Sequence, residues 1–243
     1  MRRRLIFAAL FCACSTSAAS PPDKIEPGYV KGRVVDAAGA PLAGVKMVVE
    51  HTVLHATYVY ARTGDDGRYR VEVPAGSWNV TAQIEREYHG RRHKLDLHPA
   101  IAEPFAGSAG AVRDFSLRVS GPRPQGGFYG GTLTLYRDFF DPGLELEHVE
   151  IAMTPDGPLV DGSEGKALAM KPASGGDQIQ DVPIGRYRFS ARRVAPGETP
   201  APLLLRVRNR GDFAAEVTAI LVPPYPEATG HALELEIRAK TPR

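Results

Sequence analysis

Histidine is the residue of this sequence best suited to acid–base or metal chemistry, because it changes charge near neutral pH and its ring nitrogens bind metals. One histidine opens a His-x-x-Glu sequence that runs from His231 to Glu234. Zinc peptidases combine such a pair with a third ligand further along the chain. No histidine follows His231, so that ligand is missing. We expect His231 and Glu234 to be surface side chains on or beside an edge strand.

The first part of the sequence holds five of the seven histidines: His51, His55, His89, His93 and His98. His89 and His93 are separated by Gly-Arg-Arg, and a metal site there would need Glu87 or Asp96 as a further ligand. The surrounding charges favour a solvated loop instead. A hydrolase site, which remains an alternative, would require histidines such as His51, His89 and His93 to converge in one pocket.

Three tyrosines are candidates for binding a sugar, since a flat aromatic ring can pack against a sugar face. Tyr58 and Tyr60 are two residues apart and therefore share one face of a strand, while Tyr88 lies further along. If the shared face points inward, Tyr58 and Tyr60 belong to the core. If it points outward, they form an exposed aromatic surface.

Arginines form two alternating rows in the second part of the sequence. Arg186 and Arg188 alternate with apolar residues, and Arg206 and Arg208 do the same around Val207. If the two strands pair, one face is basic and suited to an anionic glycan or lipid headgroup. Acidic rows such as Glu234–Glu236 offer the alternative of ordinary cross-strand ion pairs, each worth roughly 0.2–1 kcal/mol.

No other pattern indicates catalysis or a cofactor. The sequence has no glycine-rich phosphate loop between a strand and a helix, and no nucleophile elbow. The two cysteines, Cys12 and Cys14, lie near the start, where they are expected to be lost with a leader peptide. We therefore expect a protein that is not an enzyme and that uses neither a cofactor nor a metal.

The start of the chain has the pattern of an export signal. Arg2–Arg4 form a basic segment, Leu5–Ala13 an apolar run, and Ser17–Ala19 a small-residue cleavage site. The sequence predicts a signal peptide over residues 1–19 and a periplasmic or secreted protein. Alternatively, Phe11-Cys12-Ala13-Cys14 resembles a lipoprotein processing box, in which Cys14 would carry the lipid of an outer-membrane lipoprotein.

The charge of the chain argues against nucleic acid as a partner. The formal net charge is +2, and loss of the three leader arginines changes it to −1. A general nucleic-acid binder is expected to carry a basic excess. An envelope protein or a glycan is therefore the expected partner, and contact with a membrane is expected only through a lipid on Cys14.

An internal repeat is the clearest structural signal. Residues 73–82 read VPAGSWNVTA, and residues 182–191 read VPIGRYRFSA. Pro and Gly favour a tight turn between strands, after which the aromatic residue and the apolar residue two positions later point into a core. Alternating apolar residues elsewhere predict short strands throughout an all-β protein.

One resemblance to a known family is specific. The sequence G-x-V-x-D-x-x-G-x-P-L-x-G-V over residues 32–45, the turn D-G-x-Y over 66–69 and V-P-x-G-x-W over 73–78 resemble the carboxypeptidase regulatory-like domain. The resemblance implies a transthyretin-like β-sandwich at residues 28–120 and a divergent copy at 128–243. Residues 20–27 and 121–127 are then linkers.

These expectations define three hypotheses about function. The leading one is a non-catalytic exported module that binds a partner or has a structural role in the bacterial cell envelope. The second is a carbohydrate-binding accessory or adhesin-like protein, with the tyrosines and arginine rows as contacts. The third is a hydrolase with an unrecognised site.

Overall fold

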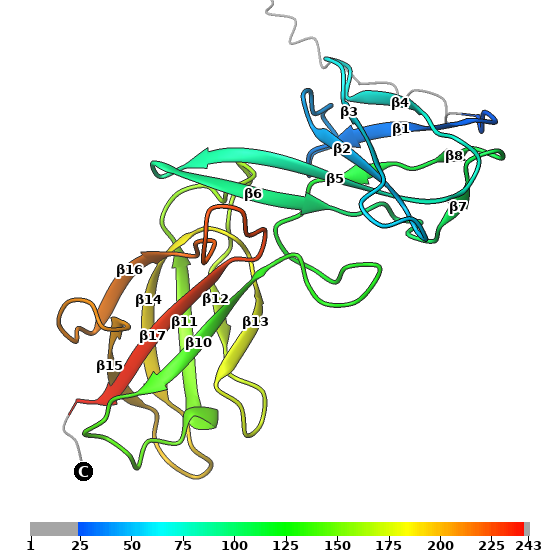
Figure 1. Ribbon diagram of the computed structural model, residues 1–243. Coiled ribbons are helices and arrows are strands. Elements are labelled where there is room, and N and C mark those ends of the chain that lie inside the picture. Colours follow the sequence, from blue (N-terminus) through cyan, green and yellow to red (C-terminus); the bar gives the residue numbers. More distant parts are fainter. Residues whose placement is uncertain (1–23, 241–243) are drawn as a thin grey trace, which may run out of the picture.

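The computed structural model describes residues 24–240, and it is built almost wholly of strands (Figure 1). The expected signal peptide and the lipidation candidate Cys14 lie outside the described residues. Within residues 24–240, no helix is both long and apolar enough to cross a membrane. We refer to residues 24–120 as the N-terminal half and to residues 121–240 as the C-terminal half.

The N-terminal half is a sandwich of two sheets. One sheet has the order β4-β1-β8, with β9 also on β1, and the other has the order β3-β2-β5-β6, with β7 also on β5. The strands are β1 (Tyr29–Val35), β2 (Lys46–His51), β3 (Tyr58–Arg62), β4 (Arg68–Glu72), β5 (Ser77–Tyr88), β6 (Arg91–Leu97), β7 (Phe105–Ala106), β8 (Ala111–Val112) and β9 (Phe115–Ser116).

The strands of the C-terminal half form one continuous sheet. Its order is β12-β11-β14-β15-β17-β10-β13, with β16 also on β14. The elements are β10 (Gly131–Arg137), the 3-10 turn η1 (Leu146–His148), β11 (Val149–Pro155), β12 (Leu168–Met170), β13 (Gln178–Val182), β14 (Arg186–Arg193), β15 (Ala201–Val207), β16 (Glu216–Ile220) and β17 (Ala232–Ala239).

The strand pairings of the two halves correspond. β1 pairs with β4 antiparallel and with β8 and β9 parallel, just as β10 pairs with β13 and β17. β2 lies between β3 and β5, as β11 lies between β12 and β14. The C-terminal half differs because β15 also pairs with β17, which joins its two layers into one sheet.

The repeated turn has the same geometry in both halves. Trp78 packs in the core of the N-terminal half and Tyr187 packs in the core of the C-terminal half. Their side chains are buried, with 2% and 0% of the residue surface exposed. The indole Nε1–H of Trp78 donates to the carbonyl oxygen of Pro74 at 2.9 Å, and the hydroxyl of Tyr187 donates to that of Pro183 at 2.9 Å. Each aromatic side chain therefore packs the core and closes the turn that precedes it.

Two apolar stretches are strands only in part, and one expected loop is a strand. In residues 52–61, the segment before Tyr58 consists of bends and turns. In residues 144–153, the 3-10 turn η1 occupies part of the range. The expected solvated loop around His93 is strand β6 instead, which leaves His93 buried.

The geometry of the β5–β6 hairpin explains why the segment around His93 is a strand. His89 and Gly90 have φ angles of +48° and +71°, the left-handed backbone of a two-residue type I′ turn. Beyond this turn His93, Leu95 and Leu97 alternate inward. The Arg-His-Lys-Leu-Asp-Leu sequence therefore has the period of a strand, although its charges suggest a loop.

A close approach of chain segments makes Gly32 sensitive to substitution. A Cβ added there would clash with the carbonyl oxygen of Arg113. We expect Gly32→Ala to lower the free energy of unfolding by about 1–3 kcal/mol, as overpacking does elsewhere. Gly143→Ala is a matched control, because an added Cβ there has no atom within 4 Å. Equal urea midpoints for the two variants would contradict the expected clash.

Candidate functional site

The outer face of sheet β3-β2-β5-β6 carries the most prominent aromatic surface of the N-terminal half. Tyr58 and Tyr60 lie on β3, an edge strand, with 41% and 57% of their surfaces exposed. Their ring centroids are 5.9 Å apart and their planes differ by 20°. The two side chains therefore lie outside the core as a pair of nearly parallel rings.

Charged groups flank this aromatic pair. The Nζ of Lys46 lies 4.7 Å from the ring centroid of Tyr60. Glu50 is directly opposite Tyr58 across the β2–β3 ladder, and its negative charge raises the pKa of the Tyr58 hydroxyl. The rings thus have a cationic donor on one side and an anionic acceptor on the other.

The next strand extends the polar face. On β5, Asn79 lies beside Glu50, and Thr81 lies beside Val48. The side-chain oxygen Oδ1 of Asn79 is buried and has no hydrogen-bond partner within the described chain. Because this oxygen is buried, a ligand on the face does not reach it, and its missing hydrogen bond is a local cost in stability.

A basic hollow lies next to the aromatic pair. It has a volume of about 290 Å³, and its walls include Lys46, Arg62, Arg86, Lys94 and a single carboxylate, Glu85. Lys94 also forms an ion pair with Glu227 at 3.1 Å, so part of its charge is neutralised. The remaining cations give this end of the face an excess of positive charge.

Tyr88 is not part of this face. Its hydroxyl donates to the carbonyl oxygen of Pro158 at 2.7 Å and accepts the backbone N–H of Arg186 at 3.0 Å. Burial raises the pKa of this hydroxyl. Tyr88 therefore connects the two halves of the chain, and the structure does not bring it together with Tyr58 and Tyr60.

The arginine rows do not combine into one free basic surface. Arg206 contacts Glu236 at 2.9 Å and Arg208 contacts Glu234 at 3.4 Å, which are the cross-strand ion pairs given above as the alternative. Arg186 pairs with Asp156 at 3.0 Å, whereas Arg188 is exposed. The rows are also separated, because β16 and not β15 pairs with β14 at residues 186–190.

The histidines do not converge. His51 packs edge-on against Trp78 at one end of β5, with ring centroids 4.8 Å apart, whereas His93 pairs with Arg86 near the other end. Eight residues of strand separate these positions, or about 26 Å. The described residues therefore do not supply the pocket that the hydrolase hypothesis requires at His51, His89 and His93.

His231 corrects the expectation of a surface histidine on an edge strand. It is 4% exposed, and the strand that follows it, β17, lies between β15 and β10. Its Nε2 is 3.0 Å from Nδ1 of His93, across the boundary between the halves. Glu234 points elsewhere and pairs with Arg208, so the two residues do not form a shared metal site.

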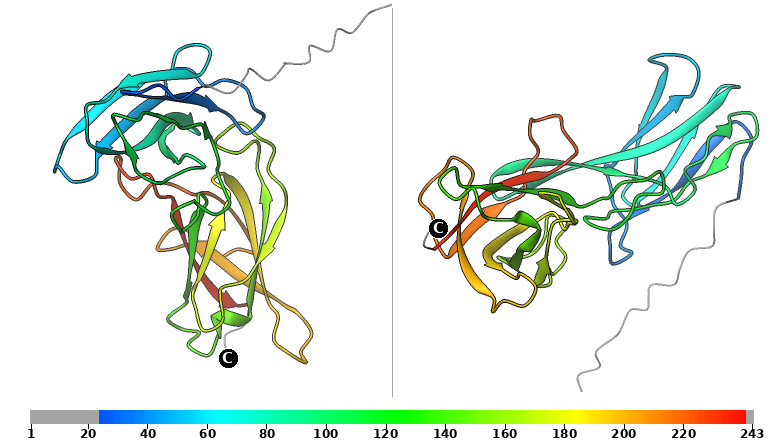
Figure 2. Two further views of the ribbon diagram at one scale, coloured as in Figure 1. Left: turned by 90° about the vertical axis from the view of Figure 1, so that its right-hand side faces the viewer. Right: turned by 90° about the horizontal axis from the view of Figure 1, so that it is seen from below.

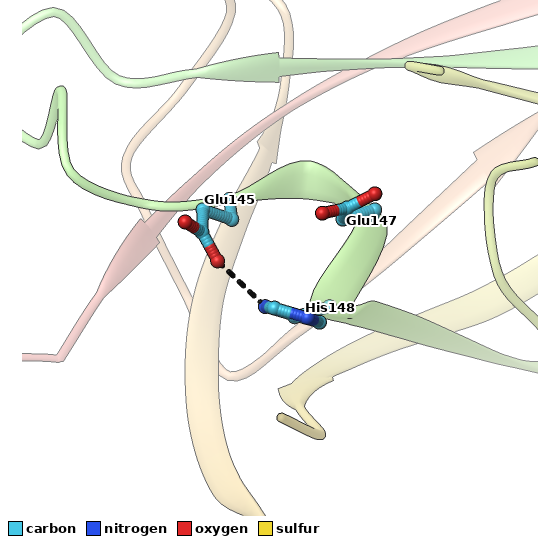
Figure 3. A group of neighbouring side chains, drawn as sticks. All are labelled: Glu145, Glu147 and His148. Carbon is cyan, nitrogen blue, oxygen red and sulfur yellow. Dashed lines mark ion pairs between the residues drawn. The ribbon is translucent and has the colours of Figure 1, made fainter. Parts of the chain in front are cut away.

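One cluster of possible metal ligands occurs within residues 24–240, at η1 (Figure 3). Its members are Glu145, Glu147 and His148. His148 already contacts Glu145 at 2.8 Å, and Glu147 accepts the backbone N–H of Gly175 at 3.0 Å. Each group thus has a local structural partner, and the cluster supplies no second feature that points to an ion.

The fold defines a class of protein: an all-β chain with a transthyretin-like sandwich. Residues 29–100 match the carboxypeptidase regulatory-like domain family, so this segment is such a domain. The matched family is the regulatory-like domain and not a peptidase catalytic domain. No curated protein matches the chain.

Solved structures with similarity to the chain include surface proteins. The Bacillus anthracis TIE protein matches 88% of this chain at 15% identity and a TM-score of 0.34, and the chain spans only 34% of that protein. A B repeat unit of the Staphylococcus aureus collagen-binding surface protein matches 89% of this chain and 100% of its own, at 10% identity and a TM-score of 0.25. A C-terminal fragment of the pilus adhesin SpaC from Lactobacillus rhamnosus GG matches 89% of this chain and 98% of its own, at 9% identity and a TM-score of 0.27.

Proposed function

We propose that this protein is a non-catalytic binding module of the bacterial cell envelope that holds a carbohydrate on the outer face of sheet β3-β2-β5-β6. The exposed, nearly parallel rings of Tyr58 and Tyr60 carry the proposal. Large apolar rings on a polar sheet face are costly to hydrate, whereas a sugar presents apolar C–H groups that can cover them. This observation favours a carbohydrate over other envelope ligands.

Polar groups around the rings supply the directional contacts that a sugar needs. The carboxylate of Glu50, opposite Tyr58, accepts a hydroxyl, and Nζ of Lys46 donates to a ring or hydroxyl oxygen. The cations of the adjacent hollow favour a sugar with a carboxylate or sulfate group. The proposed ligand is therefore an acidic glycan with its flat face on the tyrosines.

Export and tandem duplication are further parts of the proposal. The Arg2–Arg4, Leu5–Ala13 and Ser17–Ala19 pattern supports cleavage after residue 19 and a periplasmic or secreted location, with lipidation of Cys14 as the alternative. Mass spectrometry of the mature N-terminus separates the two outcomes. The corresponding strand pairings support a divergent second copy of the sandwich after residue 127.

Removing either exposed ring should weaken glycan binding. For a glycan identified on an array, we expect Tyr58→Ala and Tyr60→Ala each to raise the Kd about tenfold, a loss of about 1.4 kcal/mol. Isothermal titration calorimetry gives the Kd, and circular dichroism checks that the fold is intact. Tyr225→Ala is the matched control, because Tyr225 is 62% exposed and lies in the C-terminal half.

Two results would overturn the proposed site. One is an array that includes acidic and neutral bacterial glycans and gives no signal above background. The other is a bound glycan whose affinity changes equally in the Tyr58→Ala and Tyr225→Ala variants. Hydrolysis of a bound glycan, which the dispersed histidines do not support, would restore the enzyme hypothesis.

A further inference from the structure

Phe139 and Phe140 form an exposed aromatic pair at one end of the C-terminal half. Their surfaces are 87% and 75% exposed, and their rings meet edge to face with centroids 5.4 Å apart. Two adjacent phenylalanines facing solvent leave a large apolar area uncovered. Such residues are typical of the buried centre of an interface. We call these two residues the aromatic knob.

The loop that carries the knob is structured by buried carboxylates. Asp138 and Asp141 are 5% and 4% exposed. Oδ2 of Asp141 accepts the backbone N–H of Ala239 at 2.6 Å, and Oδ2 of Asp138 lies 3.6 Å from the guanidinium of Arg238. These contacts anchor the loop to β17. The phenylalanines are therefore displayed on a supported loop, which lowers the entropy cost of binding.

The same chain contains an apolar groove that is suited to aromatic side chains. The groove lies beside β16 and the start of β17 and has a volume of about 670 Å³. Val217, Ile220 and Leu233 are among its apolar residues. Its size falls within the range of about 300–1,000 Å³ that is typical of binding pockets.

The charges of the knob and the groove are opposite. Residues 137–147 contain four carboxylates and one cation, Arg137, which donates to the carbonyl oxygen of Pro142; Asp138 and Asp141 are buried, so Glu145 and Glu147 supply the accessible negative charge of the loop. The groove is lined by four arginines and two carboxylates, Asp212 and Glu234. Two of the arginines, Arg91 and Arg210, form no ion pair within residues 24–240, so their charges are available to a partner. An acidic loop is attracted to this groove but repelled by an anionic lipid surface.

Knob and groove lie at different ends of the C-terminal half. The knob follows β10, at the end of the sheet where β17 ends, whereas the groove is lined by β16, the start of β17 and Arg91 of the β5–β6 hairpin (Figures 1 and 2). The knob of one molecule therefore has to use the groove of another. Such a head-to-tail contact leaves one free knob and one free groove and can be repeated.

We propose that the protein associates head to tail with further copies of itself, with the Phe139–Phe140 knob of one copy in the arginine-rimmed groove of the next. This contact uses the C-terminal half and is separate from the proposed glycan face. The arginines steer the acidic loop to the groove, and the buried rings hold it there. Added salt weakens the steering contribution.

The first test measures the association of the mature chain by analytical ultracentrifugation over a range of concentrations up to millimolar. We expect the wild type to form a concentration-dependent series of oligomers. Phe139→Ser combined with Phe140→Ser removes the knob, and Arg91→Glu combined with Arg210→Glu reverses the charge of the groove. Each double variant should weaken association at least about tenfold. These side chains are exposed, so thermal unfolding should be unchanged.

Mixing the two double variants gives a sharper test. The knob variant keeps an intact groove and the groove variant keeps an intact knob, so the mixture should form a heterodimer and nothing larger. Tyr58→Ser combined with Tyr60→Ser is the control, because it removes two exposed rings elsewhere and should leave association unchanged. A monomeric wild type at millimolar concentration overturns the proposal, as does a mixture without a heterodimer. Knob-dependent binding of a monomer to phosphatidylglycerol vesicles would assign the knob to a membrane.

Discussion

Replacing Trp78 with alanine is expected to lower the free energy of unfolding by about 3–5 kcal/mol. The indole is 2% exposed and lies in the core of the N-terminal half, where alanine would leave a cavity. The substitution also removes the hydrogen bond to Pro74 and the edge-on packing of His51. Stability of a single domain is typically about 5–15 kcal/mol, so much of it would be lost.

Trp78→Phe separates the two roles of the side chain. Phenylalanine retains most of the ring burial but cannot donate to the Pro74 carbonyl, so we expect a smaller loss, made up of the hydrogen bond, at about 0.5–1.5 kcal/mol, and a small cavity. Circular dichroism during urea unfolding measures both variants. A Trp78→Ala variant as stable as Glu72→Ala, which alters an exposed residue of β4, would contradict the assigned role of the indole.

The repeated turn shows how much of the fold the sequence predicts. V-P-x-G followed by an aromatic residue predicts a turn and an inward ring, and both halves have that geometry around Trp78 and Tyr187. The hydrogen bond back to proline is not apparent from the pattern. This hydrogen bond depends on how deeply each ring enters its own core. That depth is set by the packing of the strands and not by the spacing of residues in the sequence.

Contacts between the two halves cannot be predicted from local sequence patterns. Tyr88 is a candidate sugar contact by residue type, but its hydroxyl is engaged by Pro158 and Arg186, 70 and 98 residues further along the chain. His93 and His231 are 138 residues apart, and each lies in a polar stretch that resembles surface. Alternation around His93 was the only local signal of its burial.

The candidate glycan face was partly predictable. Alternation placed Tyr58 and Tyr60 on one face, but their spacing alone did not show whether that face was inside or outside. The packing of the sheet decides this: Val59 and Ala61, which alternate with the tyrosines, pack against the core, so the tyrosines point outward. The positions of Lys46 and Glu50 beside the rings likewise depend on the pairing of β2 with β3, which the sequence does not identify.

The histidine contact between the halves leads to the last prediction, that stability falls as pH decreases through the range below neutrality. The Nδ1 atom of His231 lies 3.1 Å from the carbonyl oxygen of Thr229. A carbonyl only accepts, so this nitrogen carries the ring proton and Nε2 accepts from Nδ1–H of His93. Nε2 of His93 is buried without a partner. The hydrogen bonds of the pair are therefore satisfied when both rings are neutral. A proton added to Nε2 of His93 would have no acceptor.

Burial favours the neutral form of both rings, so the pKa of each histidine lies below its ordinary value of 6.5, and that of His231 is about 4. The positive charge of Arg91 lowers the pKa of His93 further, while Glu87 opposes this effect. Lys94 and Glu227 lie nearby as an ion pair. Between about pH 6.5 and 4 the unfolded chain binds more protons than the folded chain, so stability is lost as pH falls through this range.

For His231 alone, the difference between 6.5 and about 4 corresponds to about 3 kcal/mol of stability, present at pH 7 and lost by pH 4. Urea unfolding at a series of pH values measures the slope, and His231→Gln should flatten it. His55→Gln is the control, because His55 is exposed and its loss should leave the slope unchanged.

NMR titration of His231 with a midpoint near the ordinary histidine value would contradict burial of the neutral ring. Since the pair joins β6 to the start of β17, protonation is expected to loosen the contact between the halves before either core unfolds.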